Sequence, residues 1–191
     1  MKIKIQNFIR EHEKAISESF ASDQLEGLIK IGQKIIEAIQ RGRKIVLCGN
    51  GGSASDCQHI AAEFVGRFEK DRQSLPAIAL TTDTSILTAV ANDYGYDKVF
   101  SRQVEGLGQE GDILIALSTS GNSKNVIEAV KVARKKGMFV VGFSGESGGA
   151  LGGMVDLCFC AQAKRTAIVQ EVHMSALHAI CGLAEETLAN I

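Results

Sequence analysis

The chain has 191 residues, of which 45% are hydrophobic, so it fits one domain with a substantial core. Its formal net charge is −1, and no basic cluster is interleaved with aromatic residues, which argues against nucleic-acid binding through a broad positive surface. No charged-then-apolar leader opens the sequence, and no apolar run approaches the roughly 20 residues that cross a bilayer. We therefore expect a cytoplasmic protein without a membrane partner. The five cysteines form no CxxC pair, and we expect buried thiols.

Two amphipathic helices are predicted before the first strand, at residues 3–20 and 25–40. The first helix carries five residues along one stripe: Ile5, Phe8, Ile9, His12 and Ile16. A small α/β sheet does not need such extra helices, nor a further long one predicted at about residues 167–189, to close its core. We therefore expect residues 1–42 to bury surface between the subunits of a homo-oligomer.

Five short apolar runs predict buried strands, at residues 44–48, 77–80, 113–117, 139–143 and 155–160. A helical pattern, or a glycine-rich loop that leads into one, follows each run. Strands that alternate with helices predict a parallel sheet covered on both faces. The predicted fold class is therefore α/β, a three-layer, doubly wound, five-stranded parallel sheet with extra N-terminal helices and a long C-terminal helix.

A glycine-rich loop follows the first predicted strand. Glycines let the backbone approach a ligand closely, and the free N–H groups of the next helix attract anions. Gly49, Gly51 and Ala54 fit the G-x-G-x-x-G/A pattern of dinucleotide sites. However, the acidic residue expected about twenty residues further on would have to be Asp83, which lies about thirty residues on. We therefore do not favour a dinucleotide here.

A serine-rich loop follows the predicted strand at residues 113–117. Four hydroxyl side chains occur within six residues, on Ser118, Thr119, Ser120 and Ser123. At a helix N-terminus they make a concave cluster of donors that fits one phosphate monoester, and the absence of a Walker lysine argues against a nucleoside triphosphate. The alternative interpretation is a turn that only caps the next helix. Both loops end parallel strands, where ligands of α/β sheets bind.

Two apolar helical stretches each carry an isolated pair of polar residues. His59 and Glu63 lie about 40° apart around a helix, and Gln170 and His178 lie two turns and about 80° apart. Imidazole, carboxylate and amide oxygen are metal ligands, and the first two also transfer protons. Singly, each residue would more often be a solvated or core residue, but together on apolar helices they indicate a site.

Five motifs occur in order along the chain: Gly49-Asn50-Gly51-Gly52-Ser53, His59-x-x-x-Glu63, Asn92-Asp93, Ser118-Thr119-Ser120-Gly121-Asn122-Ser123 and Gln170-Glu171-x-His173. Together they resemble the bacterial phosphoheptose isomerases, a family within the sugar-isomerase (SIS) domain superfamily. The resemblance runs over almost the whole chain. The serine loop marks the superfamily, and His59, Glu63, Gln170 and His178 narrow it to the isomerase.

The resemblance implies a role for each matching position. Zinc, one ion per subunit and loosely held, would be bound by His59, Glu63, Gln170 and His178. Glu63 and His178 would also move protons. The phosphate would be held by Ser118, Thr119, Ser120 and Ser123. The rest of the substrate would contact Asn50, Gly51, Gly52, Glu63, Asn92, Asp93 and Gln170.

The resemblance also implies an activity, the conversion of sedoheptulose 7-phosphate to D-glycero-D-manno-heptose 7-phosphate through an enediol. In the family this step starts nucleotide-activated heptose synthesis for lipopolysaccharide core or surface glycans. The family is a homotetramer with active sites near subunit boundaries. We therefore expect one SIS domain over residues 1–191, with helices at 1–42 for oligomerisation and a sugar-phosphate-binding core at 43–191.

The sequence departs from the family in one segment and leaves alternatives open. Family members usually carry an arginine at the position of Ile168, and several carry an acidic residue where this chain has Lys-Arg-Thr-Ala at 164–167. One alternative is a non-catalytic SIS domain, either a sugar-phosphate sensor or a partner of the replication initiator. The paralogue with the initiator role lacks counterparts of Glu63 and His178, so their presence favours the enzyme. An isomerase of a shorter sugar phosphate, or a metal-free enediol mechanism, also stays open.

Overall fold

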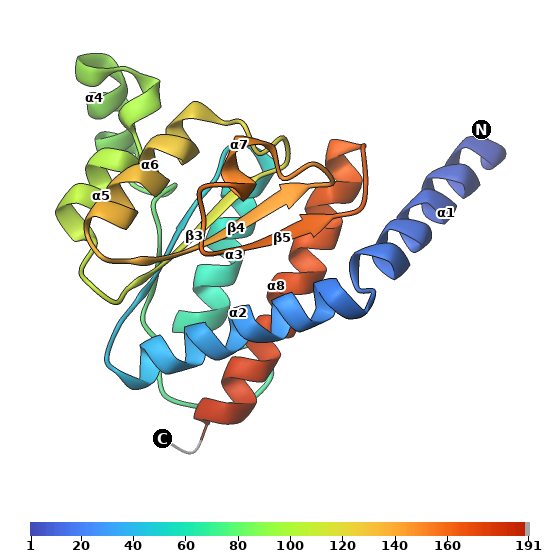
Figure 1. The fold of residues 1–191 in the computed structure, drawn as a ribbon, viewed down its shortest axis with the longest axis horizontal. Coiled ribbons are helices and arrows are strands. Elements are labelled where there is room, and N and C mark those ends of the chain that lie inside the picture. Colours follow the sequence, from blue (N-terminus) through green and yellow to red (C-terminus); the bar gives the residue numbers. More distant parts are fainter. Residues whose placement is uncertain (190–191) are drawn as a thin grey trace.

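The protein forms a three-layer α/β domain around one parallel sheet (Figure 1). The computed structural model describes residues 1–189. The strands are β1 (Ile45–Cys48), β2 (Ala77–Ala79), β3 (Ile113–Ser118), β4 (Phe139–Gly145) and β5 (Leu157–Ala161). The helices are α1 (Lys2–Ser19), α2 (Ser22–Gln40), α3 (Gly52–Val65), α4 (Thr84–Tyr94), the 3₁₀ turn η1 (Tyr96–Lys98), α5 (Ser101–Leu107), α6 (Lys124–Lys135), α7 (Gly149–Gly152) and α8 (Thr166–Leu188). The predicted fold class is confirmed.

The strand order is β2-β1-β3-β4-β5, and every neighbouring pair is parallel. The chain steps from β1 to β2 on one side and then crosses back to β3 on the other side of β1. The order therefore reverses between β1 and β3, which is the topological switch point where open α/β sheets bind ligands. The glycine-rich loop follows β1 and the serine-rich loop follows β3, so both begin at this point.

Both faces of the sheet are covered, which explains the uninterrupted apolar runs of the central strands. All residues of β1 and β3 are buried. One core cluster joins the sheet to α2, α3 and α8 through residues such as Ile35, Phe64 and Leu177. The other joins it to α5 and α6 through residues such as Val104 and Val130. The first layer therefore contains both helices that carry the predicted metal ligands.

The long helix α8 is part of the core. By length and composition it is apolar enough to cross a membrane, although half of its most apolar stretch is buried inside the protein, as in core helices that pass the same test. The sequence shows no unbroken apolar run of this length because single polar residues interrupt the apolar residues of α8. Two of these residues, His173 and Glu185, are fully or almost fully buried against the rest of the chain. Packing therefore accounts for the apolar character of α8.

The cysteines are only partly as expected. Cys48, Cys57 and Cys181 are buried, whereas Cys158 and Cys160 are half-buried on β5. The last two thiols lie on the same side of the strand, with their Sγ atoms 3.7 Å apart. Their partial exposure follows from the position of β5 at the edge of the sheet, which is covered less completely than the central strands.

Candidate active site

The helices α3 and α8 pack against each other and run in the same direction. At the start of α3, Gly52 lies against the Gln170 side chain. About two turns later on the same helix, His59 faces His178. His59 comes seven positions after Gly52 on α3, and His178 comes eight positions after Gln170 on α8. The two helices therefore advance by nearly the same length over two turns. Polar side chains of α3 and α8 therefore lie along the interface between the two helices.

Three donor atoms converge between these helices. The His59 Nε2 atom lies 3.2 Å from Glu63 Oε1 and 3.2 Å from His178 Nε2. Donor atoms of all three residues lie within 4.8 Å of one another. In a tetrahedral zinc site with bonds of about 2.0–2.1 Å, neighbouring donors lie about 3.3 Å apart. The three side chains therefore fit one divalent metal, with the two-imidazole, one-carboxylate donor set that leaves room for a further ligand.

Gln170 is the fourth predicted ligand, and its amide lies at the start of α3. A Cβ atom at Gly52 would be 2.2 Å from the Gln170 Nε2 atom, so only glycine allows this approach. Among the residues that the structure describes, no hydrogen bond joins this amide to His59, Glu63 or His178. The structure thus assembles three of the four predicted metal ligands and places the fourth beside the glycine-rich loop.

The serine-rich loop forms a compact turn held by its own hydroxyls and by β4. Ser118 and Ser123 share a hydrogen bond at 2.9 Å between their Oγ atoms, and the Ser120 Oγ accepts from the Asn122 N–H at 3.2 Å. The N–H of Gly145 donates to the Thr119 carbonyl at 3.1 Å. The N-cap of α6 makes no side-chain hydrogen bond to the helix, so capping does not explain these hydroxyls. An oxyanion at this helix start would find both hydroxyl and N–H donors.

Asn50, in the glycine-rich loop, is bound to the start of α6. Its amide exchanges two hydrogen bonds with the buried Asn125 amide, at 2.9 and 2.8 Å, and its oxygen also accepts from the Tyr96 hydroxyl at 3.1 Å. Gly51 has a φ of 57°, a conformation that favours glycine. The glycine-rich and serine-rich loops are therefore linked into one rim.

Asn92 and Asp93 lie at the end of α4 and are exposed. The Asn92 amide donates to the Asp93 carboxylate at 2.8 Å. Among the described residues, no hydrogen bond joins either side chain to the two loops or to the donor cluster. Their predicted contact with substrate stays a prediction.

Two residues beside the donor cluster were not predicted from the sequence. The carboxyl of Asp56 lies one turn before His59 on α3, and its Oδ2 is buried without a hydrogen-bond partner among the residues that the structure describes. Burial raises the pKa of Asp56 to about 6, against a smaller lowering by His59. The Phe68 ring packs on the His178 ring, with centroids 5.5 Å apart. The one-turn spacing of Asp56 from His59 was visible in the sequence, whereas nothing local pointed to Phe68.

Two further polar residues of α8 contact other elements of the fold. Glu171 forms an ion pair with His12 of α1. His173 is fully buried, and its Nε2–H donates to the Ser144 carbonyl at 2.9 Å. Ile168, where relatives were expected to carry arginine, is fully buried in the core cluster that contains α8. This position is therefore a packing position in the present chain.

A family model described as the SIS domain matches residues 8–145 of the chain. The match includes both loops and the His59–Glu63 pair but ends before α8. Whole-chain similarity covers the remainder. A phosphoheptose isomerase from Roseiflexus sp. (strain RS-1) is 57% identical over 161 residues, covering 84% of this chain and 82% of the relative. One from Campylobacter concisus (strain 13826) is 49% identical and covers 97% of each chain.

Solved structures agree with the sequence relatives. The phosphoheptose isomerase of Neisseria gonorrhoeae superposes with a TM-score of 0.92 at 41% identity, covering 97% of this chain and 98% of that one. The phosphoheptose isomerase of Francisella tularensis superposes with the same TM-score at 34% identity, covering 96% and 97% of the two chains. From the domain match, the full-length relatives and these two structures, this chain belongs to the phosphoheptose isomerase family of SIS-domain proteins.

Proposed function

We propose that the protein is an aldose–ketose isomerase that converts sedoheptulose 7-phosphate to D-glycero-D-manno-heptose 7-phosphate. The observation that carries this proposal is the convergence of His59, Glu63 and His178 between two apolar helices. The choice of substrate rests on relatives that are named phosphoheptose isomerase and match most of the chain. A regulator without catalysis would not need a proton-transfer pair at this place.

The reaction moves a hydrogen between adjacent carbons and therefore needs a base and an acid at neighbouring atoms. The Glu63 carboxylate takes the proton from carbon 1 of the ketose and returns a proton to carbon 2. The His178 imidazole exchanges protons with the two substrate oxygens as they change between carbonyl and hydroxyl. Glu63 Oε1 faces His59, which leaves Oε2 for proton transfer.

The donor set fits a zinc ion held by His59, Glu63 and His178, with Gln170 as a further ligand from α8. When bound, this ion supplies Lewis-acid polarisation of the substrate oxygens. Because an amide is a weak ligand and no described hydrogen bond holds it at the cluster, we propose that the metal exchanges readily.

The phosphate end of the substrate is assigned to Ser118, Thr119, Ser120 and Ser123 at the start of α6. The sugar hydroxyls are assigned to Asn50, Gly51, Gly52, Asn92, Asp93 and Gln170, together with Glu63. Support for the first assignment is the set of hydroxyls that α6 does not use as caps. Support for the second is the pair of hydrogen bonds that joins Asn50 of the glycine-rich loop to Asn125 of α6, the helix that follows the serine-rich loop.

The protein is further proposed to act as a homotetramer in the cytoplasm, as one domain over residues 1–191. In this arrangement, residues 1–42 contact neighbouring subunits, and residues 43–191 form the sugar-phosphate-binding core. The product would feed synthesis of lipopolysaccharide core or surface glycans. Exposed apolar residues on α1, among them Ile3 at 71% and Ile5 at 65%, support the oligomer.

The proposal is tested by proton NMR of the purified protein with sedoheptulose 7-phosphate in deuterium oxide, with and without added zinc. We expect the aldoheptose 7-phosphate with deuterium at C2, and faster turnover with zinc. Glu63→Gln removes the base and is expected to lower kcat by about 10²–10⁴-fold. The matched control is Glu186→Gln on the exposed side of α8, which should keep the wild-type rate.

Each contrary result is informative. No product from the wild type with or without zinc would contradict the isomerase. A wild-type rate for Glu63→Gln would show that another group is the base. Faster turnover of a pentose or hexose phosphate, measured in parallel, would assign the site to a shorter sugar.

A further inference from the structure

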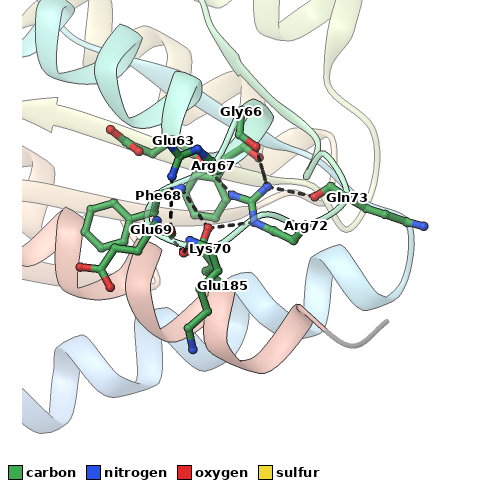
Figure 2. Close-up of polar contacts among 10 residues, drawn as sticks. Glu63, Gly66, Arg67, Phe68, Glu69, Lys70, Arg72, Gln73 and Glu185 are labelled. Atoms are coloured by element: carbon green, nitrogen blue, oxygen red, sulfur yellow. Dashed lines mark hydrogen bonds and ion pairs between the residues drawn. The ribbon is translucent and has the colours of Figure 1, made fainter.

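A buried ion pair lies beside the candidate active site, between the segment that follows α3 and the helix α8 (Figure 2). Arg72 and Glu185 each have a side chain only 2% exposed, and the Arg72 Nε atom lies 3.3 Å from Glu185 Oε1. Burying two charges is costly unless nearly all of their hydrogen-bonding capacity is used. The partners of the two side chains therefore show what the pair holds in place.

Glu185 binds the backbone of the segment just after α3. Its carboxylate accepts three successive N–H groups, from Phe68 at 2.9 Å, Glu69 at 2.7 Å and Lys70 at 2.7 Å. Burial acts to raise the pKa of Glu185, but these three donors and the Arg72 charge outweigh it and hold the pKa below its usual value. A charged carboxylate on α8 thus fixes three consecutive residues of another segment.

Arg72 binds the end of α3. Its guanidinium donates to the carbonyl of Glu63 at 2.6 Å, of Phe64 at 2.9 Å and of Gly66 at 3.2 Å. Carbonyls at a helix C-terminus lack partners within the helix. The residue whose carbonyl receives the shortest of these bonds is Glu63, the proposed base. Arg72 therefore ties the backbone of Glu63 to α8 through Glu185.

Phe68 connects this pair to His178. Its N–H is one of the three bound by Glu185, and its ring packs on the His178 ring at a centroid distance of 5.5 Å and an angle of 30°. The same ring approaches Gly182, one turn after His178, where a Cβ atom would be 3.5 Å from the Phe68 ring. The ring thus lies along one face of α8, next to both His178 and Gly182.

We propose that Arg72 and Glu185 are positioning residues that set the separation of Glu63 and His178, with Phe68 as the contact that orients the His178 ring. The pair does so by binding the end of α3 and residues 68–70 to the same turn of α8. This inference rests on the proposed function only in naming Glu63 and His178 as the working groups; the contacts themselves do not depend on it.

The test separates positioning from stability by observing His178 directly. The chain has four histidines, so the imidazole C–H resonances of the metal-free protein can be assigned with His178→Gln. In Glu185→Gln and Arg72→Lys, Phe68 is retained, and we expect the His178 resonances to shift because the ring above them moves. The His173 resonances should not shift, since that residue lies elsewhere on α8. Zinc affinity, measured by chelator competition, and kcat should each fall by roughly tenfold, with KM little changed.

Phe68→Leu keeps the ion pair intact and decides the question if either charge variant fails to fold. We expect Phe68→Leu to lower kcat and Phe68→Tyr, which restores an aromatic ring, to recover it. The control is Lys70→Ala, which keeps the backbone N–H bound by Glu185 and removes only an exposed side chain. It should match the wild type in every measurement.

Unshifted His178 resonances with wild-type zinc affinity in folded Glu185→Gln would overturn the proposal and leave a merely stabilising pair. A wild-type kcat for Phe68→Leu would overturn the orienting role of the ring. If the wild type failed to isomerise sedoheptulose 7-phosphate, the proposed function would fall, whereas the resonance shift and zinc affinity would still test the positioning.

Discussion

His173 shows how a polar residue in an apolar helix can serve the site without being part of it. It is fully buried in α8, its ring meets Phe143 edge-on at 5.6 Å, and its Nε2–H donates to the Ser144 carbonyl. Ser144 is the residue before the last one of β4, and the last one, Gly145, donates its N–H to the Thr119 carbonyl of the serine-rich loop. His173 therefore joins the helix of Gln170 and His178 to the strand that contacts the serine-rich loop.

The protonation of His173 is expected to make stability depend on pH. Burial lowers its pKa to about 4, against a smaller raising by the bond to Ser144. Between pH 6.5 and about 4 the unfolded chain binds a proton here that the folded chain does not, so stability present above pH 6.5 is lost as the pH falls. The loss at pH 5 is about 2 kcal/mol.

Urea unfolding at pH 7.5 and pH 5 measures this effect. His173→Gln keeps an N–H donor near the position of Nε2 but cannot take up a proton. We expect the variant to be less stable at pH 7.5 because it packs less well, yet to lose about 2 kcal/mol less than the wild type on acidification. An equal loss in both proteins would show that other groups cause the pH dependence.

At the scale of elements, the place of the Gln170 amide between α3 and α8 depends on a glycine at the start of α3. Gly52 leaves space for the Gln170 amide, which a Cβ atom would meet at 2.2 Å. The obstructing atom is the end of a flexible side chain, so an added methyl group would displace Gln170 rather than separate the helices. The position is helical, and alanine is favoured there over glycine.

Gly52→Ala is therefore expected to separate function from stability. We predict weaker zinc binding and a kcat lower by about tenfold, with a melting temperature equal to or above that of the wild type. Chelator competition, turnover and thermal unfolding measure the three quantities. Gly106→Ala in α5 is the matched control because no atom of the described part of the chain lies within 4 Å of its Cβ position, and it should change neither zinc binding nor turnover. Unchanged zinc affinity in Gly52→Ala would remove Gln170 from the metal site.

At the scale of the whole molecule, the helices α1 and α4 extend away from the sheet (Figure 1). Few of their residues are buried against the rest of the chain. α1 exposes Ile3, Ile5 and Ile9, at 71%, 65% and 49%. α4, which carries Asn92 and Asp93, has no buried residue. Exposed apolar surface on helices of this kind is typical of contacts between subunits.

A double substitution, Ile5→Glu with Ile9→Glu, tests this arrangement. We expect the wild type to sediment as a tetramer and the variant as smaller species, because charges would replace apolar groups at the contact. Turnover should fall with the assembly if subunits share the site. Lys14→Glu, on the opposite side of α1, is the control and should leave the assembly intact. A wild type that sediments as a monomer would contradict the oligomer.

Local patterns were sufficient for most of the fold and for parts of the site. The apolar runs at β1, β3 and β4 predicted strands because buried parallel strands need no polar face. The glycine-rich and serine-rich loops are predicted as ligand-binding loops because glycine, hydroxyl groups and free helix N–H groups lie close together in the sequence. The pair His59 and Glu63 was found because four residues make about one helical turn.

Interactions between distant segments could be decided only by the tertiary structure. The sequence by itself determined which residues could bind a metal or move a proton, because side-chain chemistry and helical spacing are local. The packing of α3 on α8 brought His178 to within 3.2 Å of His59 and left Gln170 at Gly52. It also buried Arg72 against Glu185, a contact without any local signal. Such contacts depend on how two helices meet, and that is set by the whole core rather than by either segment.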